Sequence, residues 1–271
     1  IRYFLLREVP FGSDGQFTPE ALLKRINSDL ANDLGNLVSR TAAMMIKYFG
    51  GSIPSADYRR SGPEDNGVIE MLSSLSKSSE EYLDEMQFPL ALTEIWKCIA
   101  RLNKYIDETA PWILAKNEDD KPRLAAVMYT LLEGIRIISI LLTPFIPRTP
   151  EKIYKQIGLS GNADVTSWES ASVWGLYPVG AVCKKGDPIF PRLDVDKELS
   201  ALEEIKRAAE TGAKADSESS AAEQSAKTPD DGTPEGLITI DEFSKVKLIV
   251  AEVLQAEHVD CLLYTSDAAD E

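Results

Sequence analysis

The stretch TPEALLKRINSDLANDLGNLVSRTAAMMIKYFGG, residues 18–51, carries complete start and stop signals for one long helix. Thr18 can cap the first turn, and Pro19 suits the first helical position. At the other end, Gly50 and Gly51 suit a helix terminus. Apolar residues recur every three or four positions, the spacing of one helical face: Leu23, Ile26, Leu30, Leu34, Leu37, Met44 and Tyr48. The stretch therefore predicts an amphipathic helix that buries one face against other helices.

Gly35 and Asn36 interrupt this helix with residues that disfavour helical conformation, since glycine costs about 1 kcal/mol relative to alanine. Asn36 and Arg40 are four residues apart and are therefore neighbours on a helix. With Asn36 set at zero and each residue turning the helix by about 100 degrees, Arg40 lies near roughly 40 degrees and the apolar stripe near roughly 110. The pair is thus expected on the shoulder of the buried face.

Asn36 and Arg40 carry groups that suit exposed RNA bases, because an amide both donates and accepts and a guanidinium offers a planar fork that also stacks. A solvated helix edge is the simpler interpretation of the same pair. Gly35, which lacks a side chain, would let RNA or a neighbouring helix come close beside Asn36.

Similar start and stop signals predict four more helices after this one. They are expected over residues 68–88, from Pro89 to a stop at Pro111, from Asp120 to about Leu142, and from Thr149 to about Gly158. Helices of this length joined by short polar links favour an antiparallel bundle. The fold class is therefore predicted to be mainly α.

The most apolar segment is IRIISILLTPFI, residues 135–146, and it contains Arg136 and Pro144. It is too short to span a bilayer and is expected to be a buried core helix. Trp112, in DETAPWILAK, follows Pro111 at a helix end, where an indole can stay partly exposed. An aromatic at the core edge is its simpler interpretation, and stacking on single-stranded RNA is the functional one.

The sequence changes character after Gly158. Residues 159–194 have aromatics, Gly and Pro without a helical period, and are expected to form extended segments packed on the bundle. Residues 195–236 are predicted as a charged helix followed by a disordered acidic linker, since few large apolar side chains remain. Residues 237–260 alternate as β-strands do and predict the start of a β-rich domain, too short to close. Residues 261–271 look like an atypical, foreign end.

Composition excludes several classes of function. The net charge is −15, and residues 194–235 alone hold twelve acidic and five basic side chains. Such a charge argues against coating nucleic acid by bulk electrostatics. Cys98, Cys183 and Cys261 form no CxxC pair, and His258 is the only histidine. We therefore expect reduced thiols, no metal site and no Ser/His/Asp triad.

The start of the chain and the absence of common motifs narrow the expected functions further. It begins at Ile1 without Met and without a visible signal peptide, so we expect an internal fragment of a cytoplasmic protein. GxGxxG, Walker, HExxH and GxSxG motifs are absent from the sequence. No catalytic residue is therefore expected in this chain.

Four segments resemble bacterial methionyl-tRNA synthetases. Residues 2–51 closely resemble the region after the KMSKS loop, and residues 103–116, NKYIDETAPWILAK, resemble a later helix end of the anticodon-binding domain. Residues 184–194, KKGDPIFPRLD, resemble the segment that closes that module. Residues 240–260 are similar to the start of the appended tRNA-binding OB-fold.

The resemblance implies roles for the residues discussed above. Asn36 and Arg40 match the family's NLxSR pattern, whose Asn and Arg contact anticodon bases, and Trp112 matches the Trp that stacks on the first anticodon base. It also implies that residues 1–15 end the catalytic or stem-contact region. Residues 16–158 would be the anticodon-binding domain, and residues 237–260 the start of the OB-fold.

For the parent protein, the resemblance implies ATP-dependent attachment of methionine to tRNA(Met). ATP and Mg²⁺ would bind the catalytic domain, Zn²⁺ an insertion, and the OB-fold would form a homodimer; no DNA or membrane partner is implied. The HIGH and KMSKS motifs are absent here, so no activity or cofactor is expected of this chain alone. The alternatives are the anticodon domain of another class I synthetase, such as the leucine, isoleucine, valine or cysteine enzyme, and a helical module that docks proteins.

Overall fold

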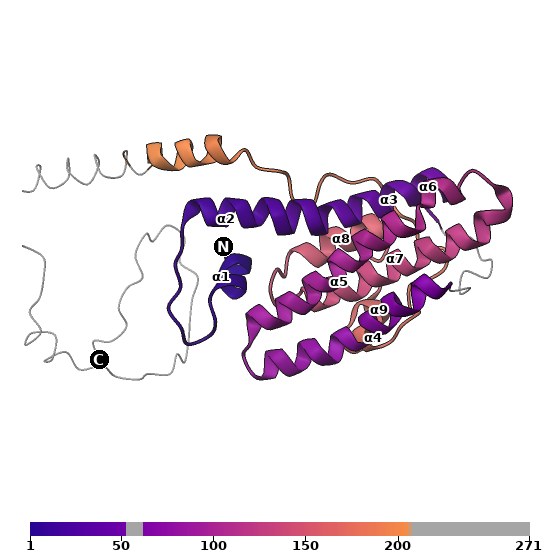
Figure 1. Cartoon of the computed structure of the whole chain (residues 1–271), viewed down its shortest axis with the longest axis horizontal. Coiled ribbons are helices and arrows are strands. Elements are labelled where there is room, and N and C mark those ends of the chain that lie inside the picture. Colours follow the sequence, from indigo (N-terminus) through magenta and orange to yellow (C-terminus); the bar gives the residue numbers. More distant parts are fainter. Residues whose placement is uncertain (53–61, 206, 208–271) are drawn as a thin grey trace, which may run out of the picture. The chain divides into compact units, whose positions relative to one another are not determined.

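The computed structural model describes residues 1–52, 62–205 and 207, and these are mainly helical (Figure 1). The chain divides into two compact units, Ile1–Gly212 and Ala213–Glu271, and the described residues all belong to the first. The predicted linker, the predicted OB-fold start at 237–260 and the end at 261–271 lie outside the described residues. His258 and Cys261 lie outside them too.

The helices follow the predicted order closely. They are α1 (Arg2–Glu8), α2 (Pro19–Arg25), η1 (Ile26–Gly35), α3 (Asn36–Phe49), α4 (Pro63–Asp84), α5 (Phe88–Thr109), α6 (Pro111–Leu114), η2 (Glu118–Asp120), α7 (Lys121–Leu141), α8 (Thr149–Ile157), α9 (Ala163–Thr166) and η3 (Glu169–Ser172). A further exposed helix covers residues 195–205, within the predicted charged helix. The prediction of a mainly α, antiparallel bundle is confirmed.

The quoted stretch forms one continuous helical rod of α2, η1 and α3, with the predicted ends. The Thr18 hydroxyl accepts a hydrogen bond from the Ala21 N–H at 3.2 Å. At the other end Gly50 has a left-handed φ of 64°, and its N–H donates to the Ile46 carbonyl. Both ends therefore satisfy backbone groups that a bare helix would leave unpaired.

The middle of the rod, η1, is a π-helix, which the sequence did not predict. The Asn36 N–H donates to the carbonyl of Ala31, five residues earlier. π-Helical turns are rare and usually short, and they need outside support. Asn103 on α5 supplies some of it, since its Nδ2 donates to the Asp33 carbonyl at 3.1 Å.

Asn27, within η1, ties the π-helix to a distant part of the chain. Its side-chain amide forms two hydrogen bonds of 2.8 Å with the backbone of Leu193. The final part of the 159–194 segment is therefore held along the π-helix. This segment was expected to be extended, but it also contains the short helices α9 and η3, where the hydroxyls of Thr166 and Ser170 donate to nearby backbone carbonyls and close local turns.

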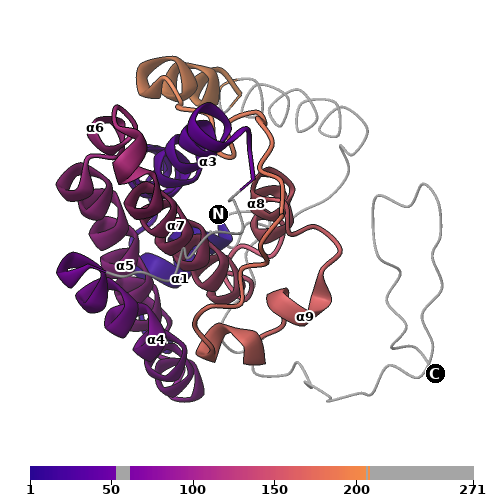
Figure 2. The ribbon, with the colours of Figure 1, turned by 90° about the vertical axis from the view of Figure 1, so that its right-hand side faces the viewer.

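The core lies between α4, α5 and α7, with α3 and α8 packed on α7 (Figure 2). Helix α4 begins five residues before the predicted start, because Asp65 and the Gly62 N–H form a cap there. The stretch 118–141, which contains α7, is long and apolar enough to cross a membrane, but its apolar window is entirely buried inside the protein. Helix α7 contains residues 135–141 of the predicted core helix, whereas residues 142–146 form turns after Leu141.

Helix α7 contains a buried ion pair, Glu133 and Arg136, with both side chains fully shielded from solvent. The Arg136 guanidinium donates to both Glu133 carboxylate oxygens at 2.9 and 2.7 Å. It also donates to the carbonyls of Val165, Ser170 and Val173. Arg136 thereby fastens the segment that contains α9 and η3 to the core.

Glu133 binds the next part of the same segment through its backbone N–H groups. Its carboxylate accepts from the backbone N–H groups of Gly175, Leu176 and Tyr177 at 2.8 to 3.1 Å. A buried charge is tolerated only when it is paired and fully hydrogen-bonded, and both conditions hold here. Arg136, which interrupts the apolar run in the sequence, is therefore a structural residue.

A second polar cluster joins three helices at Asp65, which is also fully buried. Its carboxylate accepts from Tyr105 on α5, from Arg123 on α7 and from the Gly62 N–H. Burial alone would raise the pKa of Asp65, but hydrogen bonds from Arg123, Tyr105 and Gly62 lower it below the usual value. The charged form is therefore the one that the fold stabilises.

Arg136→Met is expected to lower the free energy of unfolding by about 3–5 kcal/mol, because it leaves Glu133 buried without its partner. Urea denaturation measures the difference. Arg148→Met is the control, since Arg148 is exposed, and it should change stability by less than about 0.5 kcal/mol. Equal denaturation midpoints for the two variants would contradict the structural role of the pair.

Asp65→Asn is expected to destabilise the protein at neutral pH and much less in acid. A carboxyl whose pKa is lowered by folding stabilises the protein above its unfolded pKa of about 3.9, and this contribution is lost as the pH falls through the folded pKa. The gap between wild type and Asp65→Asn in urea titrations should therefore narrow below about pH 4. Asp119→Asn, at an exposed site, should show no such narrowing; a constant gap for Asp65→Asn would refute the prediction.

Candidate nucleic-acid interface

Arg40 and Trp112, far apart in the sequence, line one hollow of about 290 Å³ between α3 and α6. We call it the Trp112 hollow. Its lining residues are Arg40, Ala43, Met44, Lys47, Tyr48 and Trp112. The structure thus brings together two of the three predicted site residues.

Trp112 is placed by an abrupt change of chain direction. Ala110 adopts a left-handed conformation with φ 43°, which is unusual for a residue other than glycine and ends α5. Pro111 is buried and begins the short helix α6. Trp112 follows it with 43% of its surface exposed. Its ring is therefore neither a core aromatic nor fully in solvent.

Arg40 is held in place by an ion pair with Asp107 on α5, with Nη2 and Oδ1 2.9 Å apart. Both side chains are partly exposed, so the pair contributes little to stability. A guanidinium has five N–H donors, and the bond to Asp107 uses one nitrogen. The pair therefore orients the planar group at the edge of the Trp112 hollow without using all of its donors.

Asn36 lies one turn before Arg40, at the first position of α3, and its side chain is exposed. It does not line the Trp112 hollow. The structure therefore places Asn36 beside the hollow on the same helix.

Two residues of the predicted apolar stripe lie at the edge of the core. Met44 and Tyr48 are half-buried, pack against the core and also line the Trp112 hollow. The buried residues of α3 are Leu37, Val38, Thr41, Ala42 and Met45. The reason is η1: a π turn takes more residues than an α turn, so a single α-helical period cannot describe the rod on both sides of it.

The Trp112 hollow combines an aromatic face with positive charge. Arg40 and Lys47 line it, and among the described residues no carboxylate does. The Lys47 Nζ lies 5.4 Å from the centre of the Tyr48 ring. Aromatic rings and guanidinium planes bind unpaired bases by stacking, and cations bind phosphates. The hollow therefore suits a flat, anionic ligand such as a nucleotide.

Candidate metal ligands do not cluster in the described part of the chain. Within residues 1–52, 62–205 and 207, no three His, Cys, Asp or Glu side chains are grouped so as to hold a metal ion. Burial raises the pKa of the Cys98 thiol to about 12 and that of Cys183 to about 11. Both thiols are therefore poor nucleophiles at neutral pH.

Gly35 closes the π-helix just before the candidate site. A Cβ atom there would lie 3.0 Å from the Leu30 carbonyl oxygen, which the π turn brings close, and 3.9 Å from that of Phe190. The expected close approach beside Gly35 thus comes from the preceding π turn and from the extended segment, in place of a neighbouring helix. The glycine has a structural reason within the protein itself.

Comparison with known families shows to which family the chain belongs. The family model described as the anticodon-binding domain of tRNA ligase matches residues 65–226, more than half of the chain. The chain belongs to this family. A second model, described as class I tRNA synthetases (M), matches residues 1–42 of this anticodon-binding protein.

The most similar relatives carry one name. The anticodon-binding chain is 48% identical over 260 residues to methionine–tRNA ligase of Caldanaerobacter subterraneus subsp. tengcongensis. It is 47% identical over 260 residues to that of Halalkalibacterium halodurans. Each match covers 96% of this chain and 37% of the relative, so the chain spans little more than a third of their length.

Solved structures agree with the sequence comparison. Free methionyl-tRNA synthetase from Mycobacterium tuberculosis matches with a TM-score of 0.66 and 34% identity, over 71% of this chain and 38% of the other. The resemblance to methionyl-tRNA synthetases, first seen in residues 2–51 and 103–116, is confirmed.

Gly35→Ala is expected to lower the free energy of unfolding by about 1–3 kcal/mol, because the added methyl group meets the Leu30 carbonyl. Gly67→Ala is a matched control. Gly67 also lies within a helix, but nothing stands within 4 Å of a Cβ there, so the change should stabilise by up to about 1 kcal/mol. Thermal or urea denaturation compares the stabilities of the two variants. Stabilisation by Gly35→Ala would contradict the prediction, because it would mean that the backbone moves away from the added methyl group at little cost.

Proposed function

We propose that this chain recognises the anticodon of tRNA(Met) as part of a methionine–tRNA ligase. The observation that carries the proposal is the Trp112 hollow. In a chain of the anticodon-binding family, it joins an exposed indole, an oriented guanidinium and a second cation at one place. Single-stranded RNA is read by stacking splayed bases on such planes.

In this proposal Trp112 stacks on the first anticodon base, and Arg40 and Asn36 bond the edges of anticodon bases. Asn36 and Arg40 lie one helical turn apart on α3, a spacing that lets them contact neighbouring bases. A base edge needs both donors and acceptors. The Asn36 amide supplies both, and the Arg40 guanidinium supplies donors only.

The wider function is proposed for the longer protein. Class I synthetases use ATP and Mg²⁺ in a catalytic domain, and residues 1–42 match the model of class I tRNA synthetases (M). We propose that the parent protein attaches methionine to tRNA(Met) in the cytoplasm, with Zn²⁺ in an insertion. A homodimer through the OB-fold region belongs to the same proposal. Residues 1–15 would end the catalytic region and residues 16–158 would form the anticodon domain.

Two alternatives predict different ligands. The anticodon domain of another class I synthetase would bind a different anticodon, but the relatives at 47–48% identity are named for methionine. A scaffold that only docks proteins would bind no anticodon loop. Stem-loop binding therefore separates all three.

Wild type is expected to bind a tRNA anticodon stem-loop with the sequence CAU more tightly than a copy with GAU. Trp112→Ala should weaken CAU binding by about 1–3 kcal/mol, the range measured for base–aromatic stacking, and should reduce the difference between the two RNAs. Fluorescence anisotropy with labelled stem-loops measures both effects.

Ile113→Ala is the matched control for Trp112→Ala. Ile113 is the next residue in α6, is 55% exposed and does not line the Trp112 hollow. Its removal should leave binding of both stem-loops unchanged. Equal binding of CAU and GAU by the wild type would refute the proposal, as would unchanged binding by Trp112→Ala.

A further inference from the structure

Helix α3 borders a second hollow, of about 560 Å³, which we call the Lys185 hollow. Its lining includes Arg40, Ala43, Ile46, Lys47, Gln156 and Lys185. It shares Arg40, Ala43 and Lys47 with the Trp112 hollow. The two hollows therefore adjoin the same stretch of α3.

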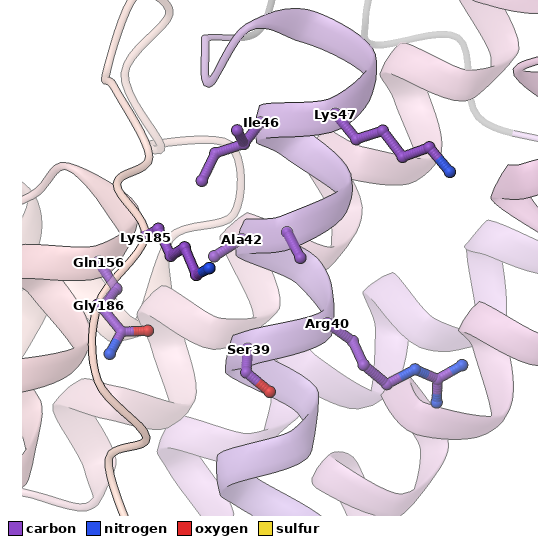
Figure 3. Close-up of a pocket in the computed structure, with 9 residues that line it drawn as sticks. Ser39, Arg40, Ala42, Ile46, Lys47, Gln156, Lys185 and Gly186 are labelled. Atoms are coloured by element: carbon purple, nitrogen blue, oxygen red, sulfur yellow. The ribbon is translucent and has the colours of Figure 1, made fainter.

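The side chains that line the Lys185 hollow point to two different sides of α3 (Figure 3). Arg40 and Lys47 extend toward one side of α3, whereas Ile46 extends toward the other, where Gln156 and Lys185 lie. A ligand that passes over α3 thus meets Arg40 and Lys47 on one side of the helix and Lys185 on the other.

The backbone that carries Lys185 is fixed at several points. The Cys183 N–H donates to the Gly51 carbonyl, and the Lys184 N–H donates to the Gln156 carbonyl, both at 2.8 Å. The Gln156 side chain then donates to the Asp187 carbonyl at 2.8 Å. Gln156 therefore holds the chain on both sides of Lys185.

Gly186 allows this close contact. A Cβ atom at Gly186 would lie 2.8 Å from the Gln156 Nε2, so any other residue would force the Gln156 side chain to move. Gln156 itself is buried. The exposed Lys185 thus projects from a backbone that has little freedom, which reduces the entropy lost when its ammonium binds an anion.

The lining of the Lys185 hollow selects an anion with an apolar part. Its charged residues are Arg40, Lys47 and Lys185, and no carboxylate lines it within the described chain. Ile46, 37% exposed, and two alanines supply an apolar wall. The chain as a whole has a net charge of −15. This group of three cations, in which Arg40 is paired with Asp107, therefore differs from the general charge of the chain.

We propose that the Lys185 hollow binds the nucleotide of the same RNA strand that adjoins the anticodon, with its phosphate at Lys185 and its base or sugar against Ile46. This inference rests on the proposed function, since it extends the RNA path from the Trp112 hollow across α3. The residues of α3 that the two hollows share, and the cations on both sides of this helix, carry it.

The test measures binding of the CAU stem-loop as a function of salt. Each phosphate neutralised in a single strand adds about 0.7 to the slope of log K against log salt. Lys185→Ala should therefore reduce the slope by about 0.7 and weaken binding several-fold at low salt. Lys77→Ala is the matched control, because Lys77 on α4 is 84% exposed and lines neither hollow.

A second variant tests the apolar wall. Ile46→Asp places a carboxylate in the Lys185 hollow and should weaken binding more than Ile46→Ala, while circular dichroism verifies that both variants are folded. In stem-loops with one neutral methylphosphonate linkage each, the effect of Lys185→Ala should disappear when the linkage next to the anticodon is the neutral one.

The outcomes separate this proposal from the anticodon proposal. If Lys185→Ala matches Lys77→Ala while Trp112→Ala still weakens CAU binding, the Lys185 hollow is not an RNA site and the anticodon proposal stands. If Lys185→Ala weakens binding of CAU and GAU alike and Trp112→Ala has no effect, the hollow binds polyanions in general, and both proposals are overturned.

Discussion

The buried pair of Glu133 and Arg136 is the constraint on which the second half of the structure depends. Residues 163–177 have no regular sheet or long helix to satisfy their backbone, and two side chains of α7 take that role. Because Arg136 donates to three carbonyls and Glu133 accepts from three N–H groups, the segment is held mainly through main-chain atoms. From there the chain continues to residues 182–193, which contact α8 and the π-helix.

The π-helix sets the geometry of the other half. It joins α2 and α3 into one rod but changes the phase between them, so that α3 buries Val38 and Met45 and turns Met44 and Tyr48 toward the surface. Asn103 donates to one of its carbonyls from α5, and Asn27, within the π-helix, bonds the backbone of Leu193.

The sequence predicted what local signals determine. Helix starts at Thr18 and Pro19, and the ends at Gly50 and Gly158, follow from capping and backbone preferences. The placement of Trp112 just past Pro111 followed from the same signals. The π turn could not be predicted because its supports, Asn103 and Leu193, are distant in the sequence. The Lys185 hollow was missed for the same reason, since α3, α8 and residues 185–186 meet only in the folded chain.

The ion pair of Arg40 with Asp107 has a consequence for how a ligand is chosen. The guanidinium already has an acceptor on one nitrogen, so a ligand either uses the donors that Asp107 leaves or displaces the carboxylate. Where it displaces Asp107, the free energy gained is only the difference between the two acceptors. A group that bonds Arg40 no better than a carboxylate then gains nothing by the displacement. Under the proposed function, the same contact would impose selectivity and make release easier, as a surface that exchanges one RNA for the next requires.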